Sequence, residues 1–165
     1  MEQKLAPMNN CLKSYQDKKP QLNLWEFFQG RIEGWGSLFD WQGRATRRFS
    51  VLIEGKWQGQ DGELQEWFVF EDGEKTERTW KIHFSDDHHF TGVAHDVIDQ
   101  AIGQQLGNAT NIRYKLRVPY KKSAIDLRMD DWMYLLDENT ILNRTKMKKF
   151  GLKVGEIVLL MKRKP

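Results

Sequence analysis

Apolar and polar residues alternate through most of this chain, and this alternation restricts the possible folds more than any other feature. In the clearest case, apolar Phe49, Val51 and Ile53 are interleaved with polar Arg48 and Ser50. Successive side chains of a β-strand point to opposite faces, so a period of two is typical of strands with one buried face. No long helical period follows the N-terminal region. The sequence therefore predicts an all-β domain.

Turn-forming residues separate these runs at Gln60 to Gly62, at Asp72-Gly73 and between Pro119 and Lys122. Roughly nine short strands joined in this way fit a β-sandwich or an up-and-down barrel. Nearly every connection resembles a local hairpin, and closure removes the edges that a long meander would expose. We therefore predict a single antiparallel up-and-down barrel around one core.

The N-terminal region differs from the rest of the chain. Residues 1–19 are polar without periodicity, which predicts a flexible tail before a barrel domain at 20–165. A short helix is expected before the first strand, with Asn23 as N-cap, Glu26 completing a capping box and Gly30 at its end. The apolar side of this helix should plug or flank the core.

The turn at Asp72-Gly73 sets the register of one hairpin. A strict two-residue turn would mix apolar and polar residues on each face, whereas a three-residue loop or bulge keeps the large apolar residues together. The bulged turn is therefore expected, pairing Glu66 with Trp80 and Phe68 with Arg78. Glu66 and Arg78 would then be diagonal neighbours on the inner face.

Charged residues inside a barrel need partners, because an uncompensated buried charge costs several kcal/mol. Glu66 and Arg78 are accordingly expected to form an internal ion pair. Two roles stay open for it: a polar anchor at the base of a ligand cavity, or a structural bridge near a barrel mouth. The candidate ligand-binding residues are Glu66, Arg78, Trp80, Tyr114, Asp131 and Arg144.

Signatures of common enzyme classes are missing from the sequence, and no catalytic residue is assigned. There is no glycine-rich loop before a helix, no G-x-S-x-G and no H-E-x-x-H. Asp130 and Asp131 are adjacent, so they should face opposite sides of a strand and share neither proton nor substrate. Either could instead pair with Arg144 or cap a turn. His88-His89 is read as an exposed turn, so no metal site and no cofactor are expected.

Charge and cysteine content limit the possible partners. The formal net charge is +3, and eight Lys or Arg lie between Arg144 and Pro165 against the single acid Glu156. This basic end fits an edge strand guarded by lysines, or a surface for phosphate or anionic lipid. Nucleic acid is not expected, because aromatic residues are not interleaved with the basic cluster. Cys11 is the single cysteine, which excludes an internal disulfide.

Seven short motifs occur in an order that is similar to one bacterial family. They are F-E-D-G-E from Phe70, R-T-W from Arg78, G-N-A from Gly107, D-D-W-M-Y from Asp130, N-R at Asn143-Arg144, M-K-K-F-G from Met147 and V-G-E from Val154. The chain from about Leu22 to Lys164 resembles the domain-of-unknown-function family numbered thirty-eight thirty-three, a family of lipoproteins.

This resemblance implies a lipocalin-like barrel in the Gram-negative cell envelope, on the periplasmic side of the outer membrane. Such relatives are tethered through a lipidated cysteine behind a signal peptide, and Cys11 stands at about that position. The sequence departs from the pattern because Met8-Asn9-Asn10 is not a lipobox and no apolar signal segment precedes it. The resemblance implies no established reaction.

Three functional hypotheses follow. The leading one is a non-enzymatic protein whose barrel cavity binds a lipid or another small apolar ligand. The second is an enzyme acting on a lipid-like substrate through Asp131, Arg144, Glu66 or Tyr134. The third is an envelope scaffold, with Cys11 or the basic C-terminal strand contacting a membrane surface or a protein.

Overall fold

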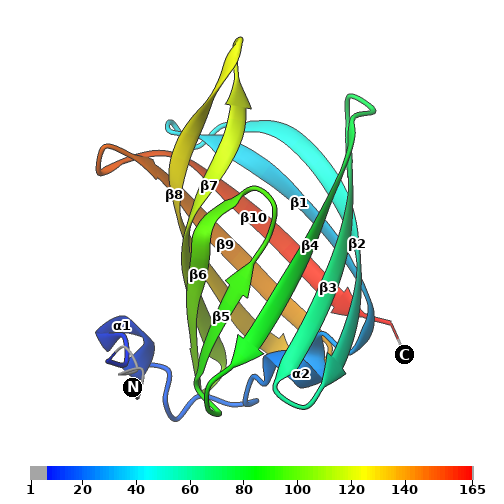
Figure 1. Cartoon of the computed structure of the whole chain (residues 1–165), viewed down its shortest axis with the longest axis vertical. Helices are drawn as coiled ribbons and strands as arrows, with labels where there is room; N and C mark the ends of the chain where they lie inside the picture. The colour runs from blue at the N-terminus through cyan, green and yellow to red at the C-terminus, as the bar shows by residue number, and fades with distance from the viewer. Residues whose placement is uncertain (1–6, 165) are drawn as a thin grey trace.

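A computed structural model describes residues 7–164 and shows a closed barrel of ten antiparallel strands (Figure 1). Each strand pairs with the next along the chain, and β1 pairs with β10. The elements are α1 (Asn10–Lys13), α2 (Leu24–Phe27), β1 (Gly30–Asp40), β2 (Ala45–Gln58), β3 (Asp61–Phe70), β4 (Lys75–Phe84), β5 (His89–Val93), β6 (Val97–Leu106), β7 (Ala109–Tyr120), β8 (Ser123–Asp137), β9 (Thr140–Lys149) and β10 (Leu152–Arg163). The prediction of an all-β, up-and-down, lipocalin-like barrel is confirmed.

The alternating pattern places one side chain in two inside the barrel. In β2, Phe49, Val51 and Ile53 are buried, whereas Arg48 and Ser50 are exposed. The apolar residues of all ten strands meet in the interior with those of α2. Within residues 7–164, neither helix is long and apolar enough to cross a bilayer.

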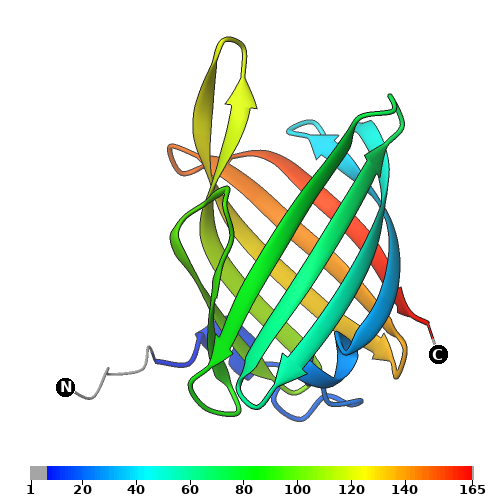
Figure 2. The same ribbon diagram turned by 45° about the vertical axis from the view of Figure 1, so that its right-hand side comes forward.

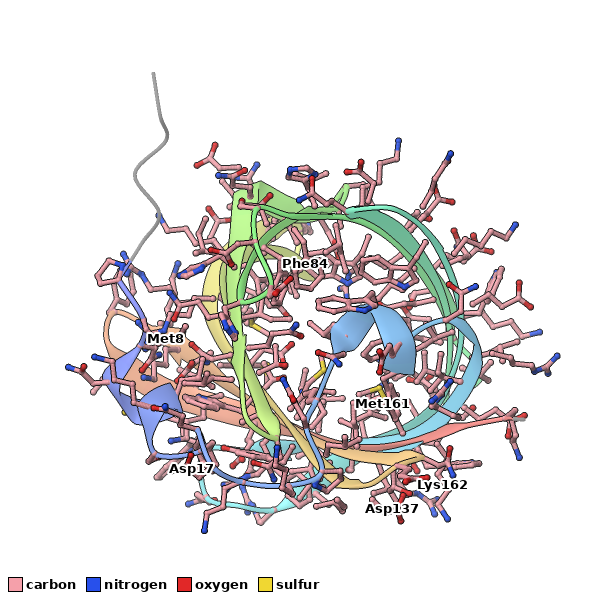
Figure 3. All side chains as sticks on the ribbon, turned by 90° about the horizontal axis from the view of Figure 1, so that it is seen from below. Met8, Asp17, Phe84, Asp137, Met161 and Lys162 are labelled. Carbon is pink, nitrogen blue, oxygen red and sulfur yellow. The ribbon has the colours of Figure 1, made fainter. Side chains whose placement is uncertain are left out.

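Successive turns of an up-and-down barrel alternate between its two ends. The turns after β1, β3, β5, β7 and β9 lie at one end, drawn uppermost in Figures 1 and 2 and here called the upper end. The remaining turns and α2 lie at the lower end. Seen from below, α2 sits inside the ring of strands (Figure 3). The lower end is therefore plugged, as the sequence led us to expect.

The plug is held by contacts from the barrel wall. Leu24 and Phe28 are buried, and Gly30 follows the helix with a φ of +87°. Asn23 is the N-cap residue, but its side chain makes no capping hydrogen bond, so the expected capping box is not formed. The Leu24 N–H instead donates to Gln105 Oε1 at 3.0 Å, which satisfies a first-turn donor from β6.

A glycine in β2 lets the end of α2 approach the wall closely. A Cβ atom at Gly55 would lie 1.6 Å from the Phe28 carbonyl oxygen, a distance that no side chain permits. The same oxygen accepts a hydrogen bond from Trp57 Nε1 at 3.3 Å. The backbone of β2 therefore fixes the position of the plug.

The segment before the plug packs against the outside of the barrel. Leu12 in α1 is fully buried, and the Asn9 N–H donates to Gln104 Oε1 at 2.7 Å. Asn9 and Leu12, within the segment predicted as a flexible tail, thus contact the barrel wall, and residues 1–6 lie outside the described part of the chain. This packing could not be predicted from local sequence, because Leu12 is an isolated apolar residue whose partners come from distant strands.

The register of β3 and β4 differs from the expected one by two positions. Glu66 lies directly opposite Arg78, rather than opposite Trp80. The Phe70 N–H donates to the Glu74 carbonyl, so the loop has three residues as expected but begins one residue earlier. A shift of two positions preserves the faces, and Glu66 and Arg78 therefore still lie on the inner side.

The basic C-terminal segment is not an edge strand, and that interpretation is wrong. β10 pairs with β9 on one side and with β1 on the other, because the barrel is closed. Lys164 Nζ lies 3.2 Å from Glu33 Oε2 of β1. Lysines in this segment therefore do not guard an open edge.

Candidate functional site

A cavity of about 120 Å³ lies inside the barrel above the plug. Leu24 and Phe28 of α2 line it, together with apolar side chains from the strands. A few polar residues interrupt this apolar lining: Glu66, Arg78, Tyr114, Asp131, Asn143 and Thr145. Apolar walls with a small number of placed polar groups are typical of ligand-binding cavities.

Arg78 is the single cation of this lining, and its guanidinium is already paired with the carboxylate of Asp96. Its Nη2 lies 2.7 Å from Asp96 Oδ2, and its Nε also donates to the Asp96 carboxylate. Burial works against the ionised form of Asp96, but the hydrogen bonds from Arg78 still lower the pKa of that carboxyl. The expected pair with Glu66 is present but looser, with Arg78 Nη1 3.6 Å from Glu66 Oε2.

Glu66 carries a polar atom without a hydrogen bond. Its Oε2 is buried and has no hydrogen-bond partner among residues 7–164. Burial raises the pKa of Glu66 to about 7, although Arg78 acts in the opposite direction, and the charge of Asp131 adds to the rise. This oxygen is therefore available to a ligand, as an acceptor when the carboxyl is ionised and as a donor when it is protonated.

Asp131 forms the second polar centre of the cavity. Its Oδ1 accepts a hydrogen bond from Asn143 Nδ2 at 2.5 Å, and its Oδ2 accepts one from the Tyr114 hydroxyl at 3.3 Å. Burial raises the pKa of Asp131 to about 6, against the effect of these hydrogen bonds. Burial and the nearby Asp131 charge raise the pKa of Tyr114 as well, so its phenol stays protonated.

The balance of charge in this region is acidic. Three carboxyl groups, those of Glu66, Asp96 and Asp131, surround the single guanidinium of Arg78. One of them, Asp96, neutralises Arg78 by direct hydrogen bonding. The other two are not bound to Arg78 by a hydrogen bond, and their carboxyl oxygens line the cavity.

Five of the six residues proposed from the sequence line this cavity: Glu66, Arg78, Trp80, Tyr114 and Asp131. The sixth, Arg144, does not. It lies on the outer face of β9, where its Nε is 2.8 Å from Glu156 Oε1. Its neighbours Asn143 and Thr145 point inward instead, because side chains alternate along a strand. Arg144 therefore faces away from the cavity, and Asn143 and Thr145 line it in its place.

The other acid/base candidates are separated as the strand geometry predicts. Asp130 faces outward and accepts a hydrogen bond from Asn111 Nδ2 at 2.8 Å, so it does not share the cavity with Asp131. Tyr134 is also outside, with its ring stacked on Trp132 at 6.0 Å between centroids. A role for Tyr134 in the cavity is therefore excluded.

Three residues of the site were missed. Asn143 and Thr145 continue the inward alternation of β9, so the period-two pattern could have found them. Asp96 could not be found in this way, because it stands in the turn between β5 and β6, outside any alternating run. Its partner Arg78 lies on β4, so no local pattern links the two residues.

Among residues 7–164, no three His, Cys, Asp or Glu side chains gather in a way that could hold a metal ion. Cys11 is an exposed free thiol on α1, outside the barrel. Its lipidation and a place in the cell envelope stay predictions.

Comparison with known proteins identifies the same family that the seven short motifs resemble. Residues 5–163 match the family described as Protein of unknown function (DUF3833). The chain belongs to this family. No curated protein sequence matches this DUF3833 chain. One solved structure that resembles it is the S-type phycobiliprotein lyase CPES from Guillardia theta, with a TM-score of 0.54 at 7% identity. The match covers 86% of this chain and 91% of the lyase, so it supports the shared barrel fold and nothing finer.

Proposed function

We propose that this barrel binds a small, mostly apolar molecule that carries one hydrogen-bond donor. The observation that supports this most strongly is the buried Glu66 Oε2, which has no hydrogen-bond partner among residues 7–164 and belongs to the lining of an apolar cavity. Leaving a buried polar atom without a hydrogen bond costs about 1–3 kcal/mol, and the ion pair with Arg78 at 3.6 Å offsets part of this cost. A ligand donor would remove that cost.

Cavity volume limits the size of the ligand. At about 120 Å³ the cavity is similar to an engineered apolar cavity of about 150 Å³ that takes up benzene. It is smaller than the roughly 300 Å³ at which pockets for drug-sized ligands begin. The ligand is therefore a molecule of about ring size or a short chain. A larger lipid would place only part of its chain inside.

The polar lining selects the head group. A carboxylate would meet the oxygens of Glu66 and Asp131, while the guanidinium of Arg78 is already bound to Asp96. A hydroxyl or amine can instead donate to Glu66. This part of the proposal separates alcohols and amines from fatty acids.

Calorimetric titration with 1-hexanol, hexylamine and hexanoate at pH 8 tests this selectivity. At that pH the pKa values of about 7 and 6 leave Glu66 and Asp131 largely ionised. A hydrogen bond to a charged group is worth about 1.5–3 kcal/mol, so the alcohol and the amine should bind at least about tenfold more tightly than the carboxylate.

Two variants complete the test. Glu66→Gln should reduce the selectivity, whereas Glu63→Gln, on the outer face of the same strand, should leave it unchanged. Equal or tighter binding of hexanoate would contradict the proposed head group. Failure of all three probes to bind would contradict a ligand of this size.

An enzyme acting on such a ligand is the second candidate. The pKa values of Glu66 and Asp131, near 7 and 6, suit proton transfer at neutral pH. The similar barrel from Guillardia theta is named a lyase, which supports this candidate. If the protein is such an enzyme, Asp131→Asn should abolish turnover of a bound ligand without unfolding the chain. Bound ligand that stays chemically unchanged in the native protein would refute this candidate.

A further inference from the structure

Apolar side chains are exposed at the tips of three turns on the upper end of the barrel. Trp41 follows β1, Tyr120 ends β7, and Phe150 and Leu152 lie at the turn between β9 and β10. The exposed fractions are 70% for Trp41, 91% for Phe150 and 71% for Leu152, and Tyr120 is half exposed. Figures 1 and 2 show these turns projecting from the same end, with the β7–β8 hairpin extending farthest.

The backbone at Phe150 shows that this exposure is not incidental. Phe150 and Gly151 form a two-residue turn in which both residues have positive φ, +51° and +76°. Such turns strongly favour Asn-Gly or Asp-Gly, because bulky side chains are strained at positive φ. The side chain of Phe150 is almost fully exposed, so packing within the barrel does not compensate for this strain.

Lysines outnumber acids at two of these tips, where Asp126 and Glu156 are the nearest acidic residues along the chain. Residues 118–125 and 147–155 together contain five lysines and no Asp or Glu. Within residues 7–164, Lys121, Lys122 and Lys148 take part in no salt bridge, whereas Lys153 pairs with Glu156. We use the name tip surface for the side chains of Tyr120, Lys121, Lys122, Lys149, Phe150 and Leu152.

We propose that the tip surface docks the upper end of the barrel onto an anionic lipid membrane. Aromatic residues concentrate at membrane interfaces, and lysines near an anionic leaflet contribute favourable electrostatic energy. A protein partner fits less well, because lysine is depleted in protein–protein interfaces. A second copy of the chain would bring like charges together. This proposal goes beyond the ligand cavity and does not depend on what the cavity holds.

Co-sedimentation with lipid vesicles tests the proposal. The native sequence should bind vesicles of phosphatidylcholine mixed with phosphatidylglycerol, and bind phosphatidylcholine alone much more weakly. Each lysine near an anionic surface is worth about fivefold in binding, so Lys121→Gln with Lys122→Gln should weaken binding about 25-fold. Phe150→Ser with Leu152→Ser should also weaken it. Added salt should reduce binding further because it screens the lysines.

A matched pair at the lower end serves as control. Leu136 is half exposed there, and Lys162 lies on the outer surface (Figure 3), so Leu136→Ser with Lys162→Gln should leave vesicle binding unchanged. All these side chains are partly or fully exposed, and unchanged thermal unfolding would show that each variant folds. The proposal is overturned if the native chain ignores anionic vesicles or if the lower-end pair weakens binding equally. A dimer that dissociates in the Phe150 and Leu152 variant would overturn it in favour of self-association.

Discussion

Replacing Glu66 by Gln should make the barrel more stable at alkaline pH. In the folded protein the pKa of Glu66 is about 7, against an ordinary value of 4.5, chiefly because burial opposes ionisation. The folded state therefore holds the proton more tightly than the unfolded chain does. Between about pH 4.5 and 7 the folded state binds more protons, so the free energy of unfolding falls as pH rises through this window.

The size of this loss follows from the pKa values. A rise from 4.5 to about 7, at 1.36 kcal/mol per pH unit, corresponds to about 3 kcal/mol against the ionised form. Solvent still reaches 13% of the Glu66 side chain, and Gln removes the attraction to Arg78. We therefore expect Glu66→Gln to gain about 2 kcal/mol at pH 8 and little at pH 5.

Urea unfolding across pH 5–8 measures this directly. The native chain should lose stability as pH rises, and Glu66→Gln should lose less, with a remaining slope near pH 4–6 from Asp131, whose pKa is about 6. Glu63→Gln, on the exposed face of β3, should follow the native profile. If Glu66→Gln were less stable at pH 8, or had an unchanged pH profile, the argument from burial would be refuted.

Three further changes test the packing. Asp96→Asn should lower the free energy of unfolding by about 2–4 kcal/mol, because Arg78 would lose its charged partner in a largely buried position; an unchanged urea midpoint would contradict this. Gly55→Ala should cost about 3 kcal/mol because its Cβ would collide with the Phe28 carbonyl, and full stability would show that the plug can move freely. Leu12→Ala should accelerate tryptic cleavage around α1 without changing global unfolding, and equal cleavage rates would show that Leu12 does not hold this segment.

Local pattern was sufficient to predict the barrel. Alternation in β2 identified Phe49, Val51 and Ile53 as inward residues, and the hairpin turns ordered the strands. The same alternation placed Glu66 and Arg78 on the inner face despite a register error of two positions. A register error of two positions leaves each residue on its correct face of the sheet, because side chains also alternate with a period of two.

Contacts between distant segments could not be predicted. Asp96 binds Arg78 from a turn that has no periodicity, and the packing of Leu12 depends on strands far along the chain. Arg144 could not be placed for a different reason. It lies on the outer face of β9, where it binds Glu156. The faces of this strand were not assigned from the sequence, and in the structure Asn143 and Thr145 on either side of Arg144 point inward.

The most direct test of the central claim is native mass spectrometry of the chain purified from its host without removal of bound lipid. We expect one small apolar molecule with a hydroxyl or amine per chain, released by organic solvent. Ala101→Leu, which fills the cavity, should lose it, and Ala124→Leu, at an exposed position of β8, should keep it. An empty native chain, or a ligand retained equally by Ala101→Leu, would contradict binding in the cavity.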